Sequence, residues 1–102
     1  MRSHQVFQYR LIDTELTAGI SFFRAAETSE DPSRRAFNME HAERACQAAL
    51  DFTAQTHLVP FLQNAIEKKT AYLRHLLNES RSRRVIFTLD SVELSSKKRS
   101  AA

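Results

Sequence analysis

Glycine and proline are almost absent from this chain of 102 residues, which contains one glycine and two prolines. Such a composition leaves little turn chemistry for a many-stranded sheet, because tight turns depend on these residues. Alanine, leucine, glutamate, glutamine and arginine, all good helix formers, dominate the middle of the chain. The sequence therefore predicts an all-α protein, and its length allows one domain at most, with a modest core.

The first predicted helix covers about residues 5–28. Its apolar residues recur at spacings of four, three, four and three, which places them along one side of a helix: Ile12, Leu16, Gly19, Phe23 and Ala26. Ile20 and Phe22 widen this stripe. The segment "TSEDPS" then predicts a turn, because Asp31 is a good N-cap and Pro32 suits the first position of a new helix.

The second predicted helix covers about residues 32–57. Its apolar face is small and consists of Ala42, Ala45, Ala49 and Phe52, flanked by Met39, Cys46 and Leu50. Because the two helices have similar lengths and a short connection, we expect them to lie side by side as an antiparallel hairpin.

Gly19, the single glycine, lies in the middle of the first predicted helix. An interior helical glycine costs about 1 kcal/mol relative to alanine, so a local requirement must offset it. We predict a close approach of the two helix backbones, with small residues on both sides. The predicted helix-packing residues are Leu16, Gly19, Phe23, Ala42, Ala45 and Ala49.

Pro60 decides how the chain continues. A proline disfavours helical geometry at the preceding residue, so we predict a break and a third helix over about residues 60–79; the alternative is one long helix kinked at this point. Leu62, Ala65, Ile66, Leu73, Leu76 and Leu77 form an apolar stripe that needs cover. The predicted architecture is an antiparallel three-helix bundle over residues 1–80.

Residues 81–102 differ in character from the rest of the chain. Apolar and polar residues alternate over 85–90, which fits a strand, a helix in context, a disordered tail or a segment paired with another copy. The net charge is +4 over 81–102 and −1 over 1–80. The tail is a candidate site for nucleic acid or another anion, although it lacks interleaved aromatic residues. The candidate contacts are Arg81, Arg83, Arg84, Lys97, Lys98 and Arg99.

Motifs for catalysis are missing from the sequence. It contains neither Glu-x-x-His nor His-x-x-x-His, the spacings that place two metal ligands on one helix face, and phosphate-binding loops need more than one glycine. Cys46 could pair with His41 or His57 as nucleophile and base, but no third orienting group is evident and Cys46 lies on the predicted core stripe. We predict no enzyme activity and no catalytic, cofactor-binding or metal-binding residue.

The cellular compartment of the protein is inferred from signals that the sequence lacks. No apolar run is long enough to cross a bilayer, and the first residues do not form a secretory signal. We expect a cytoplasmic protein without membrane contact. Cys46 is the only cysteine, which excludes an intramolecular disulfide.

Residues 15–52 resemble a set of small, uncharacterised bacterial helical proteins. The resemblance rests on a Gly-x-x-Phe helix, here Gly19 and Phe22, followed by an Asn-x-x-x-Ala-x-x-Ala helix, here Asn38, Ala42 and Ala45. It implies a helical hairpin without a known activity. The small residues Ala42, Cys46 and Ala49 are also similar to those of tetratricopeptide hairpins. More loosely, "AIEKKTAYLRHLL" resembles the third helix of microtubule-interacting-and-transport domains, which bind partner helices.

Two functional hypotheses follow. The first is a non-catalytic module that binds a helix of another protein or a second copy of itself, because its apolar residues, among them Phe22, Phe61 and Tyr72, exceed what one small core can cover. The second is binding of nucleic acid or an anionic partner through the basic tail.

Overall fold

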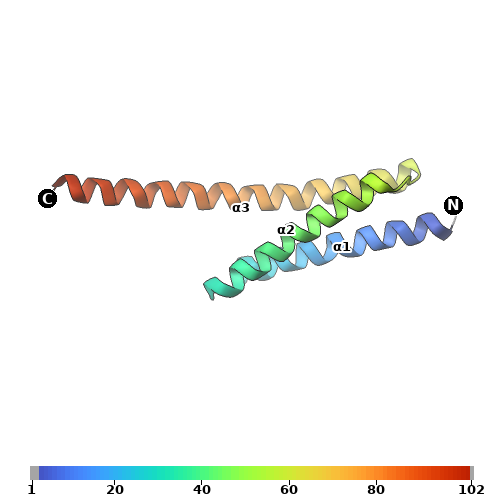
Figure 1. Ribbon diagram of the computed structural model, residues 1–102, viewed down its shortest axis with the longest axis horizontal. Coiled ribbons are helices and arrows are strands. Elements are labelled where there is room, and N and C mark those ends of the chain that lie inside the picture. Colours follow the sequence, from blue (N-terminus) through green and yellow to red (C-terminus); the bar gives the residue numbers. More distant parts are fainter. Residues whose placement is uncertain (1–2, 102) are drawn as a thin grey trace.

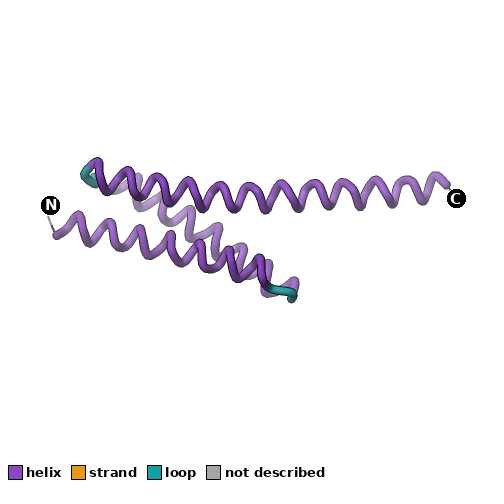
Figure 2. Tube along the Cα trace, turned by 180° about the vertical axis from the view of Figure 1, so that it is seen from behind, coloured by secondary structure: helices purple, strands orange, loops and turns teal. Residues whose placement is uncertain are grey.

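The computed structural model describes the backbone of residues 3–101 and the side chains of residues 4–83. Helices α1 (Ser3–Thr28), α2 (Pro32–Gln55) and α3 (Pro60–Ala101) follow one another up, down and up (Figure 1). This arrangement confirms the predicted all-α, antiparallel three-helix bundle. Two short loops join the helices, and α3 extends well beyond the α1–α2 hairpin (Figure 2).

The turn between α1 and α2 is fixed by its polar side chains. Asp31 caps α2, since its carboxylate accepts a hydrogen bond from the Ser33 amide at 3.0 Å, and Pro32 occupies the first helical turn. Arg35, from α2, donates through Nε to the Ser29 carbonyl at 3.2 Å. Arg35 therefore ties the first turn of α2 to the end of α1.

The chain breaks before Pro60 and does not continue as one kinked helix. Thr56 ends α2 in an extended conformation, and α3 begins at Pro60, where the missing N–H is no loss. The Val59 amide donates to the Gln5 side-chain oxygen at 2.9 Å, while the Val59 carbonyl accepts from the Gln63 amide at 2.9 Å. The start of α1 thus anchors the loop from which α3 begins.

The core lies along the axis between the three helices. Its most completely buried large side chains are Ile12 and Leu16 from α1 and Ile66 and Leu73 from α3. α2 contributes mainly small residues, Ala42, Ala45, Cys46 and Ala49, together with Met39. Because the side chains of α2 on this face are small, its backbone can lie close to α1.

Gly19 marks the tightest part of the core. A Cβ atom at this position would lie 2.8 Å from Leu73 Cδ2 and 3.0 Å from Ala45 Cβ. Both distances are below ordinary carbon–carbon contact, so a side chain here would have to displace a neighbour. The crowding comes from α3 as well as from α2, whereas the predicted close approach involved only the second helix.

Two features differ from the sequence-based expectations. Phe52, placed on the core stripe of the second helix, is 47% exposed, because successive spacings of three, four and three residues rotate it away from the buried line. α3 continues past its expected end near residue 79 to Ala101, so residues 85–90 are helical. Neither glycine nor proline follows Pro60, so the sequence offers nothing to end this helix.

Candidate functional site

The residues considered for catalysis do not lie close together, because Cys46 and His41 are on different sides of α2 and His57 lies beyond its end. Cys46 faces α3, and burial raises the pKa of its thiol, with a smaller opposing influence from Arg74 and Arg81. His41 faces α1, where its ring stacks on Phe22 at 5.0 Å between centroids. His57 lies in the loop after α2 and is exposed. A buried thiol with a raised pKa and no adjacent imidazole is a poor nucleophile.

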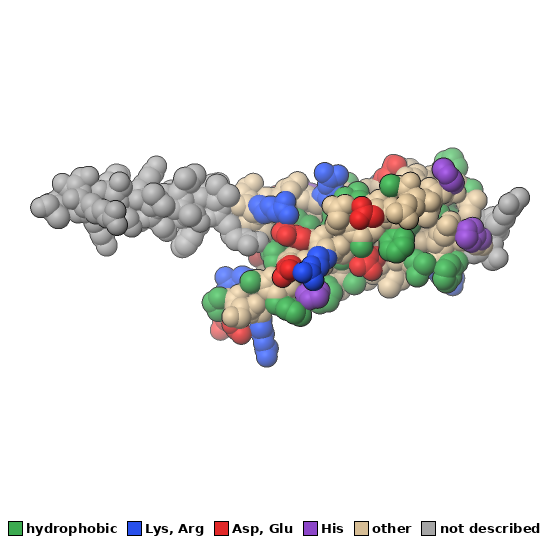
Figure 3. All heavy atoms as spheres, in the orientation of Figure 1, with side chains coloured by type: hydrophobic (Ala, Val, Ile, Leu, Met, Phe, Trp, Pro, Cys, Tyr) green, Lys and Arg blue, Asp and Glu red, His purple; other side chains and the backbone are tan. Residues whose placement is uncertain are grey.

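The backbones of α2 and α3 meet at their loop and diverge toward the α1–α2 turn (Figure 1). A furrow between them is lined by side chains of both helices. It consists of two hollows of about 210 and 170 Å³ that share Leu50 and Arg74. Side chains of both charges lie together beside it (Figure 3). Glu43 carries the one carboxylate that lines the furrow near Cys46, and its Oε1 atom forms an ion pair with Arg81 Nη2 at 3.1 Å. The furrow offers no converging set of reactive groups.

Within the described side chains, no three histidine, cysteine, aspartate or glutamate residues come close enough together to hold a metal ion. Several titratable groups instead form ion pairs that join different helices. Lys69 Nζ of α3 lies 2.7 Å from Asp13 Oδ1 and 2.7 Å from Thr17 Oγ1 of α1. These contacts orient α3 on α1.

The basic residues proposed for anion binding fall into two groups. Arg81 pairs with Glu43 of α2, and Arg83 pairs with Glu27 of α1 at 2.9 Å. Both guanidinium groups are therefore turned toward carboxylates of their own bundle. The remaining candidates are outside the described side chains: Arg84, Lys97, Lys98 and Arg99.

The predicted helix-packing residues lie together in the structure. Leu16, Gly19, Phe23, Ala42, Ala45 and Ala49 are all buried, and they bring α1 and α2 into contact along the hairpin. These residues are structural, because the bundle itself covers them. They leave open what the exposed surface does.

Four of the six exposed large apolar residues among the described side chains lie on the hairpin, and none of the six lines the furrow. Phe7 and Leu11 of α1 are 61% and 48% exposed, and Phe37 and Phe52 of α2 are 58% and 47% exposed. All four lie on the flanks where α1 and α2 adjoin, turned away from the α3 contacts made by Asp13 and Glu43. We call the surface of these residues, with Ala18, Phe22, His41 and Ala48, the outer face of the hairpin.

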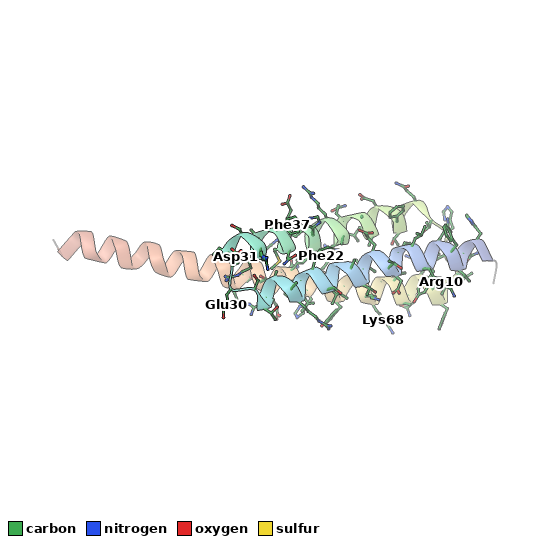
Figure 4. The ribbon with its side chains drawn as sticks, turned by 90° about the horizontal axis from the view of Figure 1, so that it is seen from below. Arg10, Phe22, Glu30, Asp31, Phe37 and Lys68 are labelled. Carbon is green, nitrogen blue, oxygen red and sulfur yellow. The ribbon has the colours of Figure 1, made fainter. Side chains whose placement is uncertain are left out.

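A cluster of three aromatic rings forms the end of the outer face nearest the α1–α2 turn. The His41 ring lies between two phenylalanines, with its centroid 5.0 Å from that of Phe22 and 4.3 Å from that of Phe37. Phe22 and Phe37 come from α1 and α2 and lie near the turn that carries Asp31 (Figure 4). Such ring pairs hold their members in fixed orientations, so this part of the face is pre-shaped.

The outer face was not among the sequence-based predictions, although the chain carries a signal for it. Phe7, Phe22, Phe37 and Phe52 follow one another at intervals of fifteen residues. A search for core stripes overlooks this pattern, because it assigns apolar residues to the inside of each helix separately. The face becomes visible only when two helices are placed side by side.

Comparison with known proteins adds no relative. No protein-family model, curated protein or solved structure matches this chain. Among the described residues, none of the helices is both long and apolar enough to span a bilayer. The candidate site therefore depends on the geometry of the chain itself.

Proposed function

We propose that this protein is a non-catalytic helical interaction module that binds an α-helical surface through the outer face of its hairpin. The observation that carries the proposal is the gathering of Phe7, Leu11, Phe37 and Phe52 on one side of α1 and α2, each about half exposed or more. Monomeric soluble proteins rarely expose a contiguous apolar patch of this kind without using it.

The chemistry of the outer face suits a helix as its partner. Its apolar side chains run along two adjacent helices, so they form a shallow strip that matches the apolar stripe of another amphipathic helix. Aromatic residues are enriched at the centres of protein interfaces, where they bury much area with little loss of side-chain entropy. The adjoining rings of Phe22, His41 and Phe37 have this character.

Binding of nucleic acid through the tail has less support. Arg81 and Arg83, two of its six candidate contacts, already pair with Glu43 and Glu27. A phosphate would have to compete with these carboxylates, which lowers the gain from each contact. The tail hypothesis therefore rests on the other four candidates, Arg84 and the last basic cluster at 97–99.

The proposal is tested by asking whether association depends on the outer face. The tagged, full-length protein is crosslinked and purified from its cells as wild type, Phe37→Ser and Phe61→Ser. Phe61 is 78% exposed but belongs to α3, so it is a matched control for the loss of one exposed phenylalanine. We expect Phe37→Ser to lose complexes that wild type and Phe61→Ser retain. If the three proteins retain the same complexes, including those with further copies of themselves, the proposal is wrong.

A further inference from the structure

The outer face repeats itself along the chain. On α1, its residues fall at spacings of four, seven and four, and α2 carries the same spacings thirty residues later. The four pairs related in this way are Phe7 with Phe37, Leu11 with His41, Ala18 with Ala48, and Phe22 with Phe52. Phenylalanine occupies both ends of the pattern on both helices, with smaller or less bulky residues between them.

The buried side of the hairpin follows the same offset. Ile12, Leu16 and Gly19 of α1 are buried, and so are the residues thirty positions later, Ala42, Cys46 and Ala49. Corresponding positions therefore have corresponding orientations in the two helices. The correspondence is one of structure as well as of sequence.

Because α1 and α2 run in opposite directions, this repeat gives the outer face an approximate two-fold symmetry about an axis perpendicular to it. Four phenylalanines, Phe7, Phe22, Phe37 and Phe52, mark its corners. When a second copy is placed face to face on a symmetric surface of this kind, equivalent positions of the two copies lie opposite each other. Whether the two-fold axis that relates the copies runs along the hairpin or across it, corners meet corners and the alanine-containing middle meets its equivalent.

We propose that the outer face is the interface of a homodimer, in which two hairpins pack face to face as a four-helix bundle with each α3 on the outside. This inference rests on the proposed function and assigns its partner, a second copy of this chain. The antiparallel order of α1 and α2 makes every helix antiparallel to its neighbours in such a bundle, as in up-and-down four-helix proteins.

The size of the face agrees with a stable dimer. The hairpin is about 39 Å long, from 1.5 Å per residue, and about 20 Å wide, so its footprint is on the order of 800 Å². A standard interface buries about 800 Å² on each partner. The half-exposed apolar side chains supply roughly 400 Å² of that area, if each large side chain has about 200 Å². An apolar centre with a more polar rim is the usual composition of an interface.

One charged position beside the outer face is neutralised within its own helix. Arg44 of α2 pairs with Glu40 of the same helix at 2.6 Å. On α1, the corresponding position is Thr14, which is uncharged. At this pair of positions a second copy therefore meets no unpaired like charge, and Ala18 and Ala48 leave room for close packing of the helices.

Sedimentation velocity of the full chain over a range of protein concentrations tests the dimer. We expect wild type to sediment as a species of twice 11.7 kDa. Phe7→Glu and Phe37→Glu each introduce two buried carboxylates into a symmetric interface, so each weakens dimerisation on the order of 100-fold or more. The two effects should be similar, because the two positions are equivalent in the repeat.

Phe61→Glu is the matched control, since it places the same charge on an exposed phenylalanine of α3 and should leave the dimer intact. Circular dichroism confirms that each variant keeps its helices, and Phe7→Ser and Phe37→Ser replace any glutamate variant that does not. Wild type that is monomeric at every concentration overturns the inference. So does a dimer that survives both outer-face substitutions or is lost in Phe61→Glu.

The outcomes also separate this inference from the function on which it rests. A monomer that still binds another protein, and loses it in Phe37→Ser, contradicts the homodimer and leaves the interaction module standing. A monomer without any binding that depends on the outer face contradicts both.

Discussion

The two faces of the α1–α2 hairpin are both apolar, but they differ in what covers them. On the inner face, small residues such as Gly19, Ala42 and Ala45 lie where the two helices approach each other, and Leu73 of α3 packs against Gly19. The outer face has phenylalanines at its ends, and no element of the described chain lies over Phe7 or Phe37. Small residues indicate where helices of one chain approach closely, and large uncovered residues indicate where a partner is expected.

The largest effect on stability is expected at the inner face. Gly19→Leu should lower the free energy of unfolding by about 1–3 kcal/mol, although leucine is the better helix former, because the new side chain would overpack the core. Its Cβ alone would lie 2.8 Å from Leu73 Cδ2. Urea denaturation at low protein concentration measures the change. A variant more stable than wild type would show that the core at this position has room.

The same clash can be assigned to its cause by a double-mutant cycle. Leu73→Ala alone should destabilise the protein, because Leu73 is fully buried. In the Leu73→Ala background, the added cost of Gly19→Leu should be smaller, since the space next to Gly19 is then open. Equal costs in the two backgrounds would place the crowding at Ala45 instead.

A much smaller effect on stability is expected at the outer face. Phe37→Ser should change the free energy of unfolding by about 0.5 kcal/mol or less at a concentration where the chain is monomeric, because Phe37 is 58% exposed. The same substitution should nevertheless weaken association. Urea denaturation and sedimentation velocity on one sample separate the two effects. A large loss of stability in the monomer would mean that Phe37 serves the fold.

The smallest effect is expected in the tail, which belongs to neither face. Replacing Lys97, Lys98 and Arg99 with glutamine should leave the association state unchanged. The nucleic-acid hypothesis requires a different result: measurable binding of duplex DNA by fluorescence anisotropy, lost in this variant, with a salt dependence that flattens by about one unit of slope for each phosphate contact removed. Wild type that does not bind duplex DNA at low salt would contradict that hypothesis.

Much of the fold could be predicted from local chemistry. The scarcity of glycine and proline favours helices, Asp31 and Pro32 mark one helix start, and Pro60 marks another. These signals are local because capping and backbone restriction act within one turn of a helix. The end of the third helix was harder to predict, since neither glycine nor proline follows Pro60 to mark where the helix stops.

The candidate site could be predicted only in part. The sequence alone indicated that apolar residues such as Phe22, Phe61 and Tyr72 exceed one small core, but not which surface would gather them. Phe52 shows why: its spacing places it at the edge of the core stripe, and only the packed structure shows that it is 47% exposed. Likewise, the charges of Arg81 and Arg83 suggested an anion, and only the packing of α3 shows that carboxylates of α1 and α2 face them.

The sequence by itself determined where the helices begin and the turn that Asp31 caps, because these depend on residues close together in the chain. Tertiary structure alone decided that α3 as well as α2 crowds Gly19, and that four phenylalanines spaced fifteen residues apart lie on the opposite side of the hairpin. The physical reason is that a surface shared by two helices depends on their relative rotation and direction. Packing of the whole core sets both the rotation and the direction, and neither can be predicted from the sequence of one helix alone.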